Sequence, residues 1–234
     1  MKLKPIATNF TLKDRVYDML RAAIIEMNIY DEDADLRLDE RSMADQLQVS
    51  RTPLREALTR LEQDRFIEIR PRKGVYLVRK TLDEILEMIV AWAALESMAA
   101  RIAAENASDV QIRELRKHAL RHSQSSSSAN LSEYSEANIL FHQMILEMSG
   151  CKMLKTLADG LFMHMHAVRR RALEENDRAT RSVVDHMEII EALEARDPDL
   201  SERLVREHTM RLHVHVRRAW TKLENVQKGK EATG

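Results

Sequence analysis

The stretch DERSMADQLQVSRTPLREALTRLEQDRFIEIRPRKGVYLV, residues 39–78, decides the fold of the N-terminal part of the chain. Apolar residues at three- and four-residue intervals predict a short helix over 39–47 and a second helix from an N-cap at Ser50 to about Gln63. Two short β-type runs around the turn 71–74 then predict a hairpin. Gly74 is the only glycine among the first 149 residues, which indicates a backbone position with positive φ in this turn.

A further helix is predicted upstream, where residues 11–28 show amphipathic spacing and Thr11 with Asp14 forms a capping pair. Three helices followed by a basic hairpin predict a winged helix-turn-helix domain over residues 1–80. In this arrangement the second helix of the motif enters the DNA major groove, and its N-terminal residues face the bases.

Two arginines stand where that second helix begins. Arg51 and Arg55 are spaced i, i+4, so both project from one face, and Thr52 lies in the first turn. Arginine pairs bidentately with guanine and also binds phosphates. Residues 41–80 contain ten basic and five acidic residues, a net charge of +5, in a chain whose overall net charge is −1. Charge alone fits a solvated helix face equally well, and the predicted wing is what favours DNA.

The quoted stretch resembles the DNA-binding domain of the GntR family of bacterial transcription regulators, chiefly through SRTPLREAL at 50–58. The chain departs from the family pattern in its acidic turn at 30–35 and at Asp64-Arg65, where the family often has glycine. The resemblance implies that double-stranded DNA, as a palindromic operator, is contacted by Arg41, Arg51, Thr52, Arg55, Lys73 and Gly74.

Helical periodicity returns after residue 81 and the strand pattern stops. Helices are predicted near 82–104, 108–123, 131–149, 151–174, 179–196 and 199–225, with a Ser-rich loop at 123–128. The predicted fold class is therefore mainly α: the winged helix-turn-helix, an all-α antiparallel six-helix bundle over 81–225, and a disordered tail over 226–234.

Composition excludes several other classes of protein. Five glycines and 4% aromatic residues argue against Rossmann, P-loop and immunoglobulin-like folds, and the single cysteine, Cys151, excludes an internal disulfide or a multi-cysteine metal site. No apolar run approaches the ~20 residues that cross a bilayer. Residues 1–10 lack the apolar core of a signal peptide, so we expect a cytoplasmic protein without membrane contact.

All nine histidines lie after residue 81. Asn138 and His142 are one helical turn apart, while His186 and His208 lie on later predicted helices with apolar neighbours. One amide oxygen and three imidazoles suit a divalent transition metal. His118 and His122 share the i, i+4 spacing, and for any single histidine a surface or core role is the better interpretation of periodicity alone.

Residues 81–225 resemble the FCD effector domain of the FadR subgroup of GntR regulators. That domain often binds a metal through a D-x-x-F-H pattern and two later histidines, and the matching segment here is NILFH at 138–142. The resemblance implies Asn138, His142, His186 and His208 as ligands of zinc, with nickel or manganese as alternatives. Asn138 replaces the usual Asp, and a neutral amide oxygen is the poorer ligand for a dication, so a carboxylate of the effector could supply the missing charge.

These features together predict a homodimeric, ligand-responsive transcription regulator, a repressor controlled by a small organic acid near the metal. Two alternatives stay open. A metal-dependent hydrolase would need an open coordination site and a general base, but the chain has no HExxH motif. A metal-free, acyl-CoA-responsive regulator would share the DNA-binding function.

Overall fold

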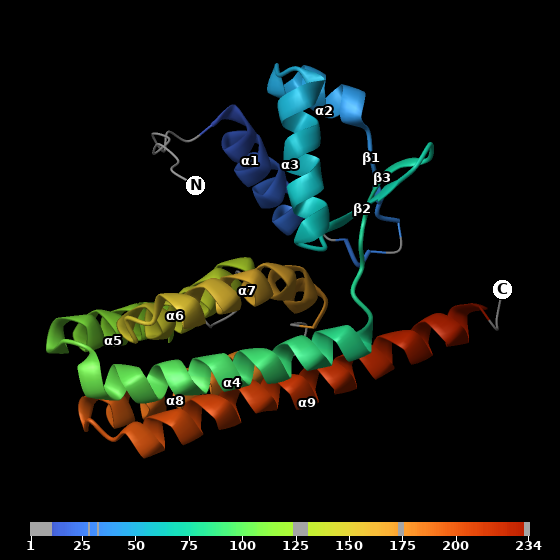
Figure 1. The fold of residues 1–234 in the computed structure, drawn as a ribbon. Helices are drawn as coiled ribbons and strands as arrows, with labels where there is room; N and C mark the ends of the chain where they lie inside the picture. The colour runs from blue at the N-terminus through green and yellow to red at the C-terminus, as the bar shows by residue number, and fades with distance from the viewer. Residues whose placement is uncertain (1–10, 28, 32, 124–130, 173–175, 232–234) are drawn as a thin grey trace, which may run out of the picture. The chain divides into compact units, whose positions relative to one another are not determined.

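The computed structural model describes residues 11–27, 29–31, 33–123, 131–172 and 176–231 (Figure 1). The chain folds into two compact units, Met1–Arg79 and Lys80–Gly234. No helix among the described residues is both long and apolar enough to cross a membrane. The Ser-rich loop predicted at 123–128 lies outside the described residues except for its first serine.

The first unit contains the three expected helices and a small sheet (Figure 1). The helices are α1 (Leu12–Glu26), α2 (Glu40–Leu47) and α3 (Arg51–Gln63), and the strands are β1 (Arg37–Leu38), β2 (Ile67–Arg70) and β3 (Gly74–Leu77). The sheet is antiparallel with the order β1-β3-β2, and Ile69 pairs with Val75 across the hairpin. The winged helix-turn-helix prediction is confirmed. The sequence did not predict strand β1, because a strand of two residues is too short to show the apolar–polar alternation from which strands are predicted.

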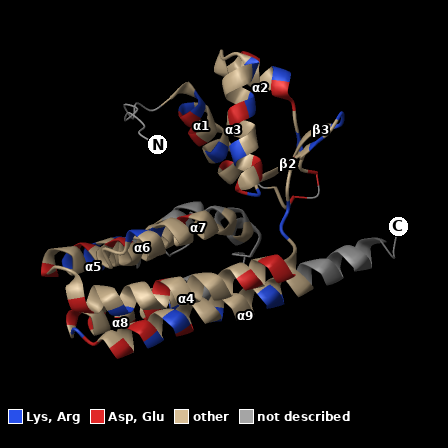
Figure 2. Cartoon of the chain, in the orientation of Figure 1, with Lys and Arg blue, Asp and Glu red and all other residues tan. Residues whose placement is uncertain are grey.

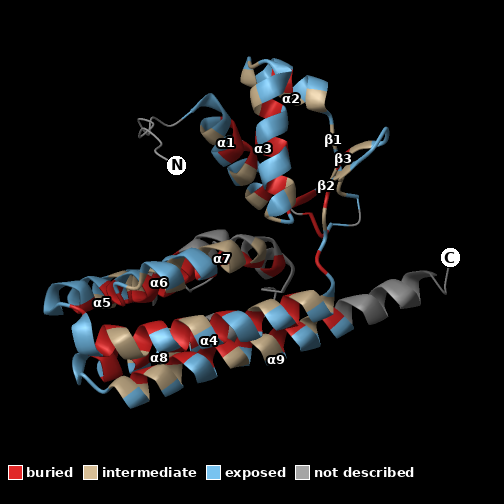
Figure 3. Ribbon diagram, in the orientation of Figure 1, coloured by how far each residue is buried: buried red, intermediate tan, exposed pale blue. Residues whose placement is uncertain are grey.

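The core of this unit lies between α1 and α3, where buried side chains from both helices meet (Figure 3). Leu54, Leu58 and Leu61 of α3 are at most 1% exposed. The predicted capping pair is present, since the Thr11 backbone N–H donates to Asp14 Oδ2 at 3.0 Å. Ser50 occupies the N-cap of α3, but its side chain makes no capping hydrogen bond.

Helix α3 ends in a left-handed residue that is not glycine. Arg65 has φ +60°, the Phe66 N–H donates to the Leu61 carbonyl at 3.0 Å, and the Arg65 N–H donates to the Glu62 carbonyl at 2.9 Å. These two bonds form a Schellman motif, which satisfies carbonyls that the helix end leaves without partners. The helix therefore ends as a glycine-terminated helix does, although arginine occupies the position. Gly74 has φ +114°, as expected for the wing turn.

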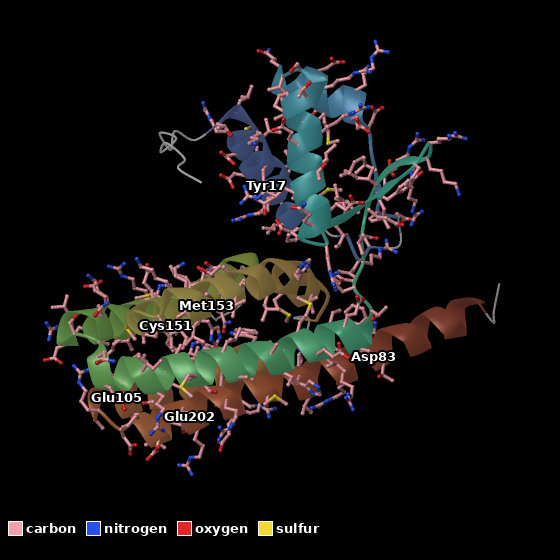
Figure 4. All side chains as sticks on the ribbon, viewed as in Figure 1. Tyr17, Asp83, Glu105, Cys151, Met153 and Glu202 are labelled. Atoms are coloured by element: carbon pink, nitrogen blue, oxygen red, sulfur yellow. The ribbon has the colours of Figure 1, made fainter. Side chains whose placement is uncertain are left out.

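The second unit is a bundle of six antiparallel helices within the described residues (Figure 1). They are α4 (Leu82–Asn106), α5 (Asp109–Ser123), α6 (Leu131–Met148), α7 (Lys152–Ala172), α8 (Asn176–Glu194) and α9 (Pro198–Glu231). Helices α4 and α9 lie side by side, and α6 and α7 pack on α4. Cys151, labelled in Figure 4, lies at the turn between α6 and α7. Trp92, Phe141 and Phe162 are the largest fully buried side chains.

The last helix extends further than the sequence predicts. Helix α9 ends at Glu231, so the segment that begins at 226 continues the helix instead of forming a disordered tail. Lysine, glutamine and glutamate are good helix formers, and the single Gly229 costs only about 1 kcal/mol within a helix. Residues 232–234 lie outside the described part of the chain.

Candidate functional site

The N-terminal end of α3 presents its polar side chains to solvent. Arg51, Thr52 and Arg55 are all exposed, while the leucines one and two turns along α3 face the core. Arg55 Nε donates to Glu40 Oε2 at 3.0 Å, which joins α3 to the first residue of α2. Long cationic side chains on one exposed face are suited to phosphates and base edges.

The other predicted DNA contacts are exposed or half-buried. Arg41 is exposed in the first turn of α2, whose N-cap Asp39 accepts hydrogen bonds from the backbone N–H groups of Arg41 and Ser42. Lys73 is exposed in the turn between β2 and β3, at the tip of the hairpin, where Figure 2 shows lysine and arginine gathered. Gly74 follows it at the start of β3. The six predicted residues thus lie on α2, on α3 and on the hairpin.

Three of the nine histidines meet inside the bundle. His142 of α6, His186 of α8 and His208 of α9 are 1%, 6% and 4% exposed. Their ring centroids are 4.9 to 5.5 Å apart, and each ring offers a nitrogen within 4.8 Å of those of the other two. Zinc–nitrogen bonds are about 2.0–2.1 Å, so two nitrogens on one ion lie at most about 4.2 Å apart, which is close to the spacing of these three rings.

Two carboxylates orient these rings from behind. His142 Nδ1 lies 2.5 Å from Glu96 Oε1 of α4, and His208 Nδ1 lies 2.8 Å from Asp185 Oδ2 of α8. An ionised carboxylate only accepts hydrogen bonds, so a ring that pairs with one through Nδ1 carries its proton there. In that tautomer Nε2 is the nitrogen through which a histidine can bind a metal. Carboxylate partners of this kind are typical of metal-binding histidines.

The predicted fourth ligand lies in the same buried region. Asn138 is 6% exposed, and the Ser182 hydroxyl donates to its Oδ1 at 3.1 Å. Ser182 Oγ also lies 3.4 Å from His186 Nε2, so one hydroxyl lies between the amide and the imidazole. Asn138 Oδ1 accepts this hydrogen bond, and a side-chain amide oxygen is one of the donor types that bind divalent cations. The three imidazoles therefore fit a divalent transition metal by donor type, burial and spacing, and the Asn138 amide adds an oxygen donor in the same buried region.

The two outer carboxylates have polar partners of their own. Glu96 is fully buried, and the Thr209 hydroxyl donates to its Oε2 at 3.3 Å. Burial alone would raise the pKa of Asp185, but the hydrogen bond and charge of His208 and the Arg211 guanidinium hold that pKa below its usual value. Asp185 is therefore ionised near neutral pH and favours the Nδ1-protonated form of His208.

Among the other histidines whose side chains the structure describes, none belongs to this group of three. His118 Nε2 lies 2.7 Å from the Ala137 carbonyl oxygen, a bond that ties α5 to α6. His213 is half-buried on α9, and burial together with Arg217 lowers its pKa. The side chains of His122 and His166 lie outside the described residues, so the structure tests no pairing of His118 with His122.

Sequence reasoning missed the carboxylates that contact the predicted ligands. Glu96 has a visible signal, since it is the only charged residue in the apolar run between Glu87 and Arg101. A lone acid on a helix face that must be buried needs a buried partner. Asp185 precedes His186 in the chain but pairs with His208, a contact that only the packing of α8 on α9 reveals.

A winged helix-turn-helix unit joined to a helical bundle with a buried polar cluster defines a class, the DNA-binding regulators that sense a ligand. Comparison with known families agrees with this class. Residues 12–77 match the model of the bacterial regulatory proteins of the gntR family, and residues 87–211 match the FCD domain. The chain belongs to the GntR family and carries an FCD domain. It is a ligand-responsive, DNA-binding transcription regulator and not an enzyme, which sets the hydrolase alternative aside.

Curated relatives are similar over most of their length. The chain is 24% identical over 206 residues to the HTH-type transcriptional repressor RspR of Escherichia coli, covering 88% of this chain and 89% of that protein. It is 28% identical to the transcriptional repressor NanR of Citrobacter rodentium over 191 residues, 72% of each chain. The Uxu operon regulator of Haemophilus influenzae is 27% identical over 193 residues, 76% of this chain and 72% of that protein.

Solved structures share the fold. The Escherichia coli protein McbR/YncC superposes with a TM-score of 0.76 at 20% identity, covering 90% of this chain and 99% of that chain. A GntR regulator from Rhodococcus sp. RHA1 superposes with a TM-score of 0.69 at 20% identity, covering 87% and 96%. At this identity the likeness concerns the fold alone.

Proposed function

We propose that this regulator is a homodimeric repressor whose operator affinity is controlled by a small organic acid bound at a divalent metal in the bundle. Asn138, His142, His186 and His208 would hold the metal, and zinc is the ion we expect, with nickel or manganese as alternatives. The observation that carries the proposal is the buried cluster of three imidazoles, two of which are oriented by carboxylates. When bound, the metal would supply a Lewis-acidic point of attachment for an anionic effector.

The donor set itself favours an acidic effector. Three imidazoles and one amide are all neutral, so the negative charge nearest a dication held by them would come from Glu96 and Asp185 behind the rings and not from a ligand atom. A carboxylate entering from solvent would supply the anionic oxygen that aspartate supplies in the pattern this chain resembles. Organic acids therefore fit this site better than neutral or cationic metabolites.

In the N-terminal unit, Arg51, Thr52 and Arg55 would read bases in the major groove, while Arg41 and the wing residues Lys73 and Gly74 would contact the backbone and the adjacent groove. Two copies of the head would bind the two halves of a palindromic operator, as dimeric helix-turn-helix proteins do. The effector can shift the operator affinity only by its differential affinity for the DNA-bound and free arrangements. Repression is consistent with the relatives RspR and NanR, which are both named as repressors.

The test combines His142→Ala with His208→Ala in the full-length chain. We expect the double variant to lose its bound metal by elemental analysis, and to lose any change in melting temperature produced by a panel of organic acids, while its affinity for operator DNA stays within about twofold. His213→Ala, on the same helix as His208 and outside the cluster, is the matched control. Equal metal content in the double variant and the wild type would refute the metal site.

A chelator tests whether the organic acid binds through the metal. The same organic acids are screened by thermal shift with and without EDTA, and acids that act through the metal should stabilise only the untreated protein. Stabilisation that survives EDTA would instead favour the metal-free alternative, in which acyl-CoA compounds are the next ligands to test.

A further inference from the structure

Among the arginines predicted to read DNA, Arg55 is restrained in a way that the others are not. Its Nε donates to Glu40 Oε2 at 3.0 Å, although the Arg55 side chain is 66% exposed and the Glu40 side chain 31%. Within the described part of the chain, no ion pair is recorded for Arg41 or Arg51, which are also exposed. Glu40 is the first residue of α2, where the positive end of the helix dipole favours a carboxylate.

We propose that Glu40 is a positioning residue that holds the Arg55 guanidinium in the orientation in which it reads the operator. The inference rests on the proposed function, because it takes Arg55 to contact DNA. It adds an acidic residue to a set of predicted DNA contacts that otherwise contains only cationic and neutral residues, and it gives that residue a role in specificity.

The geometry of the pair leaves the useful donors free. The contact uses Nε, whereas the two terminal nitrogens of the guanidinium form the fork that pairs with O6 and N7 of guanine. A free arginine side chain has high rotamer entropy, part of which is lost when it docks on a base. An arginine already held in place by a neighbouring carboxylate loses less of that entropy on binding.

Because Glu40 is negatively charged, the direction in which its removal changes the operator affinity tests the proposal. A carboxylate beside the DNA-contacting face repels phosphates, so its removal should by itself strengthen binding to DNA of any sequence. If Glu40 positions Arg55, its removal should instead weaken binding to the operator and leave other DNA bound as well as before or better. The two roles therefore predict opposite changes on the same duplex.

The experiment measures two duplexes in parallel at one salt concentration. The first is an operator selected by the full-length protein from a random duplex library, and the second is its shuffled sequence. We expect Glu40→Gln and Glu40→Ala to bind the operator about 5–10-fold more weakly and the shuffled duplex no more weakly, so that their ratio falls. Two variants are used because one substitution in α2 could disturb folding, and melting temperatures identify the variant that stays folded.

The matched control is Glu56→Gln, which removes the same charge from the residue next to Arg55. Glu56 pairs with Lys13 at 3.3 Å instead of with Arg55. This control should leave both affinities unchanged or raise them together, and a fall in its operator affinity as large as that of Glu40→Gln would overturn the proposal.

A double-mutant cycle completes the test. In an Arg55→Ala background, Glu40→Gln should no longer weaken operator binding, because the side chain it positions is absent. An unchanged or tighter operator complex for Glu40→Gln, with Arg55→Ala still weakened, would overturn the role of Glu40 alone. An Arg55→Ala variant with wild-type affinity would overturn the proposed contact of Arg55 itself.

Discussion

Arg51 and Arg55 lie exposed on α3, whereas His142, His186 and His208 are at most 6% exposed within the bundle. A guanidinium is always charged and keeps its hydration until DNA replaces the water, so it belongs on a surface. A neutral imidazole can be buried if its N–H has a partner, which Glu96 provides for His142. The two units therefore depend on different kinds of support. The exposed face needs charge and an oriented side chain, whereas the buried histidines need hydrogen-bond partners beside their rings.

The dependence of the buried cluster on its support is tested by Glu96→Gln. The glutamine amide keeps the shape of the side chain but removes the negative charge beside His142 Nδ1. We expect the metal affinity to fall about 10–100-fold, measured by zinc titration against a competing chelator. Glu105→Gln, an exposed position on the same helix that is labelled in Figure 4, should leave the affinity unchanged. If both variants bind zinc equally well, the outer carboxylate does not support the cluster.

The exposed face is tested by Arg51→Ala. Loss of a bidentate base contact should weaken operator binding by about 1–3 kcal/mol, measured by gel shift or fluorescence anisotropy. The metal content should not change, because Arg51 belongs to the other compact unit. Arg113→Ala removes an equal charge from an exposed position of α5 and serves as the control. Equal losses in the two variants would mean that Arg51 acts only through net charge.

The smallest expected effects are changes in the free energy of unfolding when either of two arginines with left-handed backbone conformations is replaced by glycine. Arg65 is exposed at the end of α3 with φ +60°, and Arg196 follows α8 with φ +57°. Arg65→Gly should raise the free energy of unfolding of its unit by about 0.5–1 kcal/mol, since glycine adopts this conformation without strain.

Arg196→Gly should do the opposite. The Arg196 guanidinium donates to the Ala107 carbonyl and to Asp109, and thereby ties the end of α4 to the turn before α9. Urea denaturation of the full chain, followed by probes in each unit, measures both substitutions. Stabilisation by Arg196→Gly would show that the guanidinium contacts contribute less than the backbone strain.

Much of this architecture is readable from residue spacing. The helix that holds Asn138 and His142, the hairpin and its glycine turn follow from local periodicity and turn chemistry, and their prediction is confirmed within the described residues. The choice of His142, His186 and His208 among nine histidines needed the family resemblance, because each lies on a different helix and spacing along the chain does not reveal which helices meet. The structure brings these three together, while their role as ligands remains a prediction.

What sequence could not supply is long-range pairing. Glu96 and His142 are separated by 46 positions and Asp185 and His208 by 23, so no local rule connects them. Strand β1 was missed for a different reason. Its two residues are extended because they pair with β3, and nothing in their own sequence predicts a strand. The left-handed Arg65 also contradicts local preference, and the Schellman bonds outweigh it.

Helix α4 has a mechanical consequence. It begins at Leu82, three residues after the first compact unit ends, and contains neither glycine nor proline, the usual causes of sharp kinks. Glu96 lies 14 residues along it, about 21 Å from its start at 1.5 Å per residue. A rod of this length converts a tilt of about 3° at Glu96 into a displacement of about 1 Å at Leu82. If α4 moves as a rigid rod, a shift at the contact between Glu96 and His142 would therefore displace Leu82 more than the residues beside the cluster.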